Sequence, residues 1–228
     1  MIPRRIQALV LTTVILASAV PAVMASRQAA IDSVRSSTQV FTGKVSESQK
    51  IPKSVLEKAV AIAIIPDVIK AGFILGGTRG AGVLVAREAS GKWSNPAFVT
   101  LTGGSVGLQV GAQSSDVIMV FNTKKSLEKA LAQDFSLGGS VSGSAGPTGA
   151  NPVTATSTVP DVYTYVRNRE GLFGGVSLQG IKLAIDESRN AEFYGKPGIT
   201  TQQIFAGEVR VPEAASLRQT LNRYAPAP

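Results

Sequence analysis

Apolar residues recur at near-helical spacing in the chain that follows residue 25. Ile31, Val34, Phe41 and Val45 are separated by polar positions, which predicts an amphipathic helix over 26–48. One face of this helix is therefore expected to cover a core or another apolar surface.

A second helix is expected to begin after Pro52. Its apolar positions share one side and its charged positions the other: Val55, Leu56, Ala59 and Val60 against Lys53, Glu57 and Lys58. The helix runs into AIAII (61–65), which is apolar all round and fits a buried strand as well. We expect Pro66 to end this element in either case, because proline removes a backbone donor.

From Gly72 onward the pattern changes to apolar runs that contain paired glycines. The alternation of period two is clearest after Gly104, where Val106, Leu108 and Val110 share one side. Strand faces made of glycine and serine mark sharp coiling or close backbone approach. We therefore expect a strongly curved, mainly antiparallel, barrel-like sheet. The four segments are GFILGGTRGAG (72–82), VTLTGGSVGLQVG (99–111), FSLGGSVSGSAGPTG (135–149) and GLFGGVSLQG (171–180).

The remaining pattern completes an α+β domain with helices flanking the sheet at both ends of the chain. Further strands are expected at 83–87, 97–101, 116–121, 162–166 and 181–185, with a loop over 150–160. A helix is expected over 124–135, and a last helix opens at Pro212 with Ala214, Leu217, Leu221 and Tyr224 on one face. We expect one domain over 26–225, followed by a loose tail at 226–228.

The first 25 residues have the pattern of a cleaved signal peptide. Arg4 and Arg5 precede the apolar run 8–20, and Val23-Met24-Ala25 places small or apolar residues where signal peptidase reads. Thirteen residues are too few to cross a hydrocarbon core, which needs about 20. An uncleaved anchor over 8–25 is the alternative, and Pro21 argues against it. We expect an exported protein, periplasmic or extracellular, that is peripheral at a membrane.

Composition narrows the chemistry further. The chain has 23 Lys+Arg and 15 Asp+Glu, and the signal removes two Arg, which leaves 21 − 15 = +6. This balance favours acidic partners, and export favours anionic lipids over nucleic acid. The chain has neither cysteine nor histidine. Disulfides, thiolate metal sites and imidazole bases are therefore excluded, and we expect no cofactor, no metal site and no catalysis.

Three short motifs resemble chemical sites. Residues 103–107 match G-x-S-x-G around Ser105, but no histidine can take the serine proton. Ser126 and Lys129 match S-x-x-K on an amphipathic helix, where a solvated face is the simpler explanation. Successive backbone N–H groups in GGTRGAG (76–82), near Arg79, are a candidate anion nest. Asp186 and Glu187 are adjacent and would face opposite ways on a strand.

From 51 to 195 the chain resembles the SYLF domain family. The resemblance is carried by 51–87, by 93–121, by 135–149, by 163–180 and by NAEFYG at 190–195. It implies a compact α+β fold with a β-rich core and binding to anionic lipids, phosphoinositides in eukaryotic members. Those members also bind actin filaments, a role with no evident meaning for an exported protein. The family offers no catalytic residues to carry over.

The resemblance places lipid contacts near the start of the domain, where basic and apolar residues are mixed. Four cations at about 1 kcal/mol each give only millimolar affinity, and two inserted apolar side chains would bring it near micromolar. The same residues would also suit a helix that merely covers a core. The alternative function is an envelope scaffold that binds a protein or polymer through the glycine-lined sheet face. The candidate lipid-binding residues are Lys50, Lys53, Lys58, Lys70, Arg79, Val55, Leu56 and Phe73, with Ile64 as a further apolar candidate.

Overall fold

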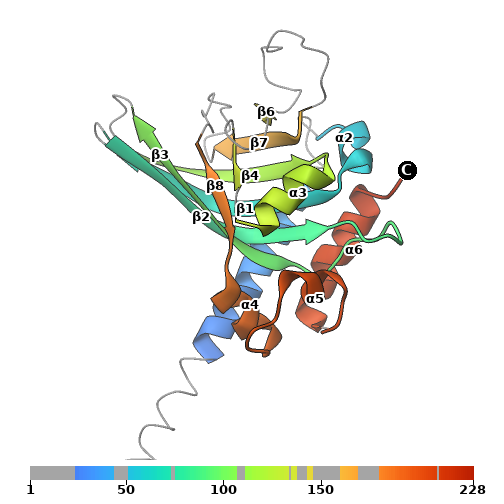
Figure 1. Ribbon diagram of the computed structural model, residues 1–228. Coiled ribbons are helices and arrows are strands. Elements are labelled where there is room, and N and C mark those ends of the chain that lie inside the picture. Colours follow the sequence, from blue (N-terminus) through green and yellow to red (C-terminus); the bar gives the residue numbers. More distant parts are fainter. Residues whose placement is uncertain are drawn as a thin grey trace, which may run out of the picture.

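A computed structural model of the chain describes residues 24–43, 51–72, 75–106, 111–133, 135–137, 143–145, 160–168, 180–209 and 211–228. Its strands form one curled sheet in the order β5-β8-β3-β2-β1-β4-β7-β6 (Figure 1). Neighbouring strands are antiparallel, except that β6 runs parallel to β7. The strands are β1 Ala61–Gly72, β2 Leu75–Ala86, β3 Ala97–Val106, β4 Gly111–Phe121, β5 Phe135–Ser136, β6 Gly143–Ala145, β7 Val162–Asn168 and β8 Lys182–Ile185.

Helices cover both faces of this sheet. A helix over 24–43 leads into α2 Lys53–Lys58, and α3 Lys124–Leu131 lies inside the curl (Figure 1). The C-terminal part supplies α4 Glu187–Tyr194, α5 Thr201–Phe205, the 3-10 turn Pro212–Ala214 and α6 Ala215–Tyr224. The predicted α+β class with flanking helices is confirmed.

The curl brings strands together that are far apart in the sheet order. The ring centroids of Phe121 in β4 and Phe135 in β5 are 5.5 Å apart, although four strands separate β4 from β5. The inner face therefore closes on itself as a half-barrel, and α3 packs in its mouth through Ala130, Leu127 and Leu131. The predicted strongly curved, glycine-rich sheet is confirmed.

Alternation along the strands produces two hydrophobic cores. Ile65, Leu84, Leu101 and Met119 point to the inner face. Their neighbours point to the outer face, where the helix over 24–43 and helices α4 to α6 cover them. The outer core includes Val34, Phe41, Ile64, Val85, Phe98, Ile118, Phe193, Leu217 and Leu221.

The expectation that Pro66 ends this element is wrong, because β1 contains a bulge there. Of the two alternatives for residues 61–65, the structure shows the strand, and this strand continues past Pro66 to Gly72. The register shifts between Ile64 and Ile69, and Asp67 has a positive φ of 49°. A bulge leaves a residue unpaired, so proline's missing N–H costs the ladder nothing there. Ser37 from the N-terminal helix donates its hydroxyl to the Ile64 carbonyl at 3.4 Å.

The bulge presses β1 against β2 at Gly82. A Cβ on Gly82 would lie 2.1 Å from the Ile64 carbonyl oxygen and 2.7 Å from the Ile65 Cα. A Cβ on Gly80 would lie 2.8 Å from side-chain carbons of Ile65 and Val68. Gly82 is therefore required for close backbone approach, as the sequence pattern predicts for this sheet, and Gly80 leaves room for two side chains of β1.

Arg87 ties the two ends of the domain together. Its guanidinium donates to the carbonyls of Ala59 (2.8 Å), Leu56 (2.9 Å) and Ala225 (3.3 Å) and lies 4.3 Å from the centroid of the Trp93 ring. The Trp93 indole N–H donates to the same Ala225 carbonyl at 2.7 Å. Burial lowers the pKa of Arg87. The cation therefore links α2, the β2–β3 hairpin and the end of α6.

Several element boundaries differ from the expectations. Helix α3 ends at Leu131 rather than at residue 135, because Gln133 adopts a left-handed φ of 57° and Phe135 joins β5. Asp186 is not in a strand: its carboxylate caps α4 by accepting from the Arg189 N–H at 3.0 Å. Helices α4 and α5 were not predicted. The predictions for Val45, Leu108, Val110, 146–159 and 171–179 fall outside the described residues.

The contact at Gly82 generates a stability prediction. Gly82→Ala is expected to lower the free energy of unfolding by about 3 kcal/mol or more, because backbone rather than a side-chain tip occupies the space. Gly77→Ala is the matched control in the same strand, since nothing lies within 4 Å of its Cβ position. It should be neutral or stabilising by about 0.5 kcal/mol. Urea unfolding followed by circular dichroism measures both, and equal effects would contradict the proposed close approach.

Candidate functional site

The predicted candidates on α2 do not form a membrane-inserting surface. Leu56 is 2% exposed and belongs to the outer core, so its assignment to lipid contact is corrected here. Val55 packs half-buried against the same core, and Ile64 is fully buried. The helix is short and its apolar side must cover the sheet, so its exposed residues are Lys53, Ser54 and Lys58.

The predicted basic residues separate into two groups. Lys53 and Lys58 lie before the start of β1, whereas Lys70 and Arg79 lie near its far end. Eight residues of strand between Ala61 and Ile69 span roughly 26 Å. Lys53 is also paired with Glu57 at 3.5 Å. Lys50 and Phe73 lie outside the described residues.

Lys70 and Arg79 lie on opposite faces of the sheet. Val68 belongs to the inner core, so Ile69 points outward and Lys70 inward. Arg79 is directly opposite Ile69 in the β1–β2 ladder and shares its outer face. Of the predicted basic residues in this part of the sheet, the structure therefore brings only Arg79 to the outer face.

An exposed row crosses the outer face beyond the helices. Ile69 in β1, Arg79 in β2, Thr102 in β3 and Lys182 in β8 are successive cross-strand partners. All four are exposed, and Ile69 is 53% exposed although its side chain is large and apolar. The row spans three strand spacings, or about 14 Å. Figure 1 shows this part of β2 and β3 projecting past the helical layer.

The next row toward the strand tips has almost no side chains. Ala71, Gly77 and Gly104 are consecutive partners and are exposed, and a Cβ on either glycine would meet nothing within 4 Å. We call the two rows together the distal outer face: Ile69, Ala71, Gly77, Arg79, Thr102, Gly104 and Lys182. It combines an exposed apolar side chain, two cations and a smooth surface, and the nearest described carboxylate in its strands is Asp67 at the bulge.

Ile69 and Lys182 were missed by the sequence analysis. The alternation in IKLAI places Lys182 opposite to Ile181 and Leu183, so its outward direction was readable. The direction of Ile69 was not, because the bulge between Ile64 and Ile69 reverses the alternation.

The motifs that resemble chemical sites have structural explanations where they are described. Ser126 is fully buried, and its hydroxyl lies 2.8 Å from the Thr123 carbonyl, to which it donates. Residues 76–82 lie inside β2, where all of them pair with β3 and 76–79 also pair with β1, so the proposed anion nest near Arg79 is wrong. Among the described residues, no group of acidic side chains could hold a metal ion. None of the described helices has the length and apolar character to span a bilayer.

Comparison with known families identifies the domain. Residues 102–224 match the family model Ysc84, described as a Las17-binding protein actin regulator. The chain belongs to the Ysc84 family. The expected SYLF membership is thereby confirmed.

Eukaryotic relatives match over most of this chain. Protein YSC84 of Saccharomyces cerevisiae is 38% identical over 172 residues, which are 73% of this chain and 36% of that protein. Another yeast relative, LAS seventeen-binding protein 3, is 37% identical over 73% of this chain and 37% of its own length. SH3 domain-containing YSC84-like protein 1 of Homo sapiens is 33% identical over 81% of this chain and 54% of its own.

The match with these relatives is partial on their side. The chain spans between about a third and about half of the length of each. The name of the second describes a binding partner and that of the third a domain content, and none of the three names an enzymatic activity. What is shared is therefore the Ysc84 domain itself.

Proposed function

We propose that this protein is a non-enzymatic lipid-binding protein that docks on anionic membranes through the distal outer face. The observation that carries the proposal is Ile69, a large apolar side chain left 53% exposed directly opposite Arg79. Exposed apolar side chains beside cations suit the boundary between lipid headgroups and acyl chains. The net charge of the chain, +8, has the sign that attracts an anionic leaflet.

The contacts of the described residues account for weak and reversible docking. Arg79 and Lys182 contribute about 1 kcal/mol each near an anionic surface. The exposed half of Ile69 contributes about 1 kcal/mol when it leaves water. The sum of about 3 kcal/mol corresponds to a dissociation constant of about 6 mM. Docking should therefore weaken as salt is raised.

The N-terminal basic group is the weaker candidate for the same role. Lys53 and Lys58 lack an exposed apolar neighbour on α2, because Leu56 faces the core and Val55 packs against it. The Lys53–Glu57 pair also offsets part of the positive charge. These two lysines provide a control with the same change in net charge.

The smooth row around Gly77 and Gly104 favours a second candidate function. A sheet face with almost no side chains also suits a protein or polymer partner that lies against it, as in an envelope scaffold. Actin binding, which the family description suggests, is a third candidate function. Co-sedimentation with actin filaments instead of vesicles distinguishes it from lipid binding.

Liposome co-sedimentation tests the site. The double variant Arg79→Gln/Lys182→Gln is expected to bind vesicles of phosphatidylglycerol and phosphatidylcholine about thirtyfold more weakly, because two contributions of about 1 kcal/mol are lost. Ile69→Asn should weaken binding about fivefold by removing the apolar contact. At about 0.1 M ionic strength the screening length is about 10 Å. Lys53→Gln/Lys58→Gln should therefore change binding by less than about threefold.

Each of the other possible outcomes would reject a different part of the proposal. Strong loss in the α2 double variant alone would keep lipid binding and reject the distal outer face. Equal pelleting with neutral vesicles would reject the electrostatic contribution. Failure to pellet with any vesicle, together with a stoichiometric protein partner or binding to actin filaments, would replace lipid docking by one of the competing functions.

We further propose that the chain is exported and cleaved after Ala25. Met24 is 70% exposed, and Ala30 is the first core residue of the N-terminal helix. Among the described residues, cleavage would remove only the exposed Met24 and Ala25 and would keep the 2.8 Å ion pair between Arg27 and Glu213.

Fractionation of bacterial cells tests export. The mature protein is expected outside the cytoplasm with Ser26 at its N-terminus, as read by N-terminal sequencing. Ala25→Gln should accumulate a longer precursor, because signal peptidase requires a small residue at this position. Full-length chain in the cytoplasm of wild-type cells would contradict the proposal.

A further inference from the structure

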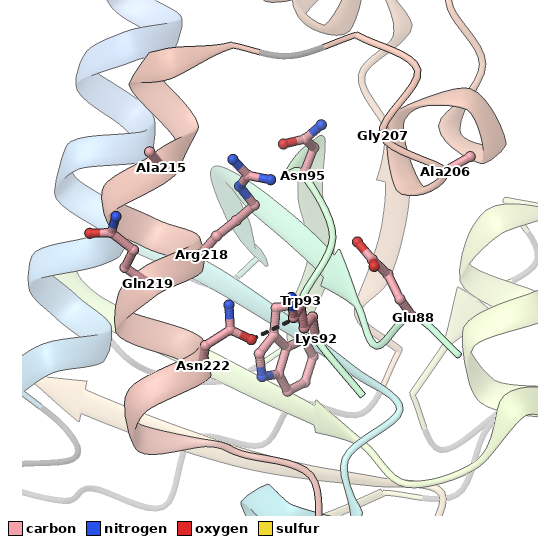
Figure 2. A pocket seen from close by; sticks show the side chains of 10 residues that line it. All are labelled: Glu88, Lys92, Trp93, Asn95, Ala206, Gly207, Ala215, Arg218, Gln219 and Asn222. Carbon is pink, nitrogen blue, oxygen red and sulfur yellow. Dashed lines mark hydrogen bonds between the residues drawn. The ribbon is translucent and has the colours of Figure 1, made fainter. Parts of the chain in front are cut away.

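A cavity of about 500 Å³ lies between the β2–β3 hairpin and the C-terminal helices, away from the distal outer face. Its walls include Glu88, Lys92, Trp93 and Asn95 from the hairpin side and Arg218 and Asn222 from α6 (Figure 2). Its volume lies within the range of about 300–1,000 Å³ that is usual for small-molecule sites.

The wall of this cavity is rigid on the hairpin side. The Trp93 backbone N–H donates to the Asn222 Oδ1 at 3.1 Å, which joins the hairpin to α6 (Figure 2). The Trp93 ring is held by the Ala225 carbonyl and by Arg87. A preformed wall of this kind favours binding, because little ordering is left to occur when a ligand enters.

Asn95 supplies a buried acceptor without a partner. The residue is 2% exposed, and its Nδ2 donates to the Val209 carbonyl at 3.0 Å. This bond fixes the orientation of the amide, since the reversed amide would place two oxygens together. Asn95 Oδ1 is buried and accepts no hydrogen bond. A buried polar atom without a partner is destabilising unless a ligand satisfies it.

Arg218 supplies the complementary donor. Its Nε is buried without an acceptor, and within the described part of the chain its guanidinium makes no ion pair. Figure 2 shows the Arg218 side chain extending from α6 toward Asn95. The cavity therefore offers an unused cationic fork close to an unused amide oxygen, and planar guanidinium groups bind carboxylates well.

We propose that this cavity binds a compact ligand with a carboxylate next to an N–H group. The carboxylate is held by Arg218, and the N–H donates to Asn95 Oδ1. Both an α-amino acid and the C-terminal residue of a peptide present this chemistry. Exposed Glu88 and Lys92 at the cavity wall complement a ligand that carries both signs of charge. Both Asn95 Oδ1 and Arg218 Nε lack a partner in the structure, so hydrogen bonds to a ligand would satisfy two buried polar atoms.

Trp93 makes the proposal directly measurable. It is the single tryptophan of the chain and lines the cavity, so its fluorescence reports on this site. The probes are N-acetylalanine, alanine, propionate and N-acetylalaninamide. The first two carry both groups, propionate lacks the N–H, and N-acetylalaninamide lacks the carboxylate. At least one of the first two is expected to bind about tenfold or more tightly than either of the last two.

The two sources of the ligand are separated by Glu88→Gln. Tighter binding of N-acetylalanine, unchanged in this variant, would indicate a peptide end. Tighter binding of alanine, weakened in this variant, would indicate a free amino acid whose ammonium group faces Glu88. Both results support the proposed carboxylate site.

Arg218→Gln tests the anchor. It is expected to weaken binding of the preferred probe by about tenfold or more, and Arg218→Lys by less, because the ammonium keeps the charge and loses the fork. Arg223→Gln on the exposed side of α6, where Arg223 stacks on Tyr224, is the control and should bind as the wild type does. Circular dichroism confirms that each variant is folded.

Three results would overturn the proposal. The first is an unchanged Trp93 emission with each of the four probes at about 10 mM, a concentration at which even weak binding is detected. The second is equal binding of all four probes. The third is unchanged affinity in a folded Arg218→Gln variant, and none of these results bears on lipid docking by the distal outer face.

Discussion

The close approach of β1 to β2 at Gly82 is the constraint on which the rest of this structure depends. The Ile64 carbonyl and the Ile65 backbone occupy the space where a Cβ of residue 82 would be, so only glycine permits the bulge at Pro66 and Asp67. Bulges increase local twist and bend the strand. The sheet can then curl until Phe121 of β4 meets Phe135 of β5, and the inner core closes around α3. A flatter sheet would leave that apolar inner face open to water.

The same bulge decides which side chains face solvent. On both neighbours of β1 the register changes by one residue across it, as the pairs Ile64↔Val83 and Ile69↔Arg79 show. A one-residue shift reverses the direction of every later side chain. Val68 therefore enters the inner core and Ile69 points outward beside Arg79, whereas an uninterrupted strand would do the opposite. The exposed apolar position on which the proposed lipid docking rests is thus a consequence of backbone geometry.

This explains how far sequence reasoning could go. The strands at 83–87, 97–101 and 116–121 were predicted because uninterrupted alternation or apolar runs carry their own signal, and the paired glycines indicated a curved sheet. Pro66 was misread as an end, because no local pattern distinguishes a proline at a bulge from a proline that terminates a strand. Leu56 was misassigned for a different reason: an amphipathic helix looks the same whether its apolar side meets a sheet or a bilayer, and only tertiary contacts decide. The cavity residues Asn95 and Arg218 lie more than a hundred positions apart and had no shared signal.

Strand β2 also determines how the two proposed sites relate. Arg79 lies near its beginning, and the cavity wall begins at Glu88, just after its end, so about nine residues of extended chain separate them by roughly 30 Å. A bilayer in contact with the distal outer face would therefore leave the cavity outside the headgroup region. The strand between the two sites is clamped by β1 at Gly82 and by Arg87 at its end, where the guanidinium holds carbonyls from α2 and from the end of α6. A ligand in the cavity would contact Trp93, which packs against Arg87 at the end of this strand. Because a closely packed strand that is held at both points resists deformation, we expect the two sites to be occupied independently.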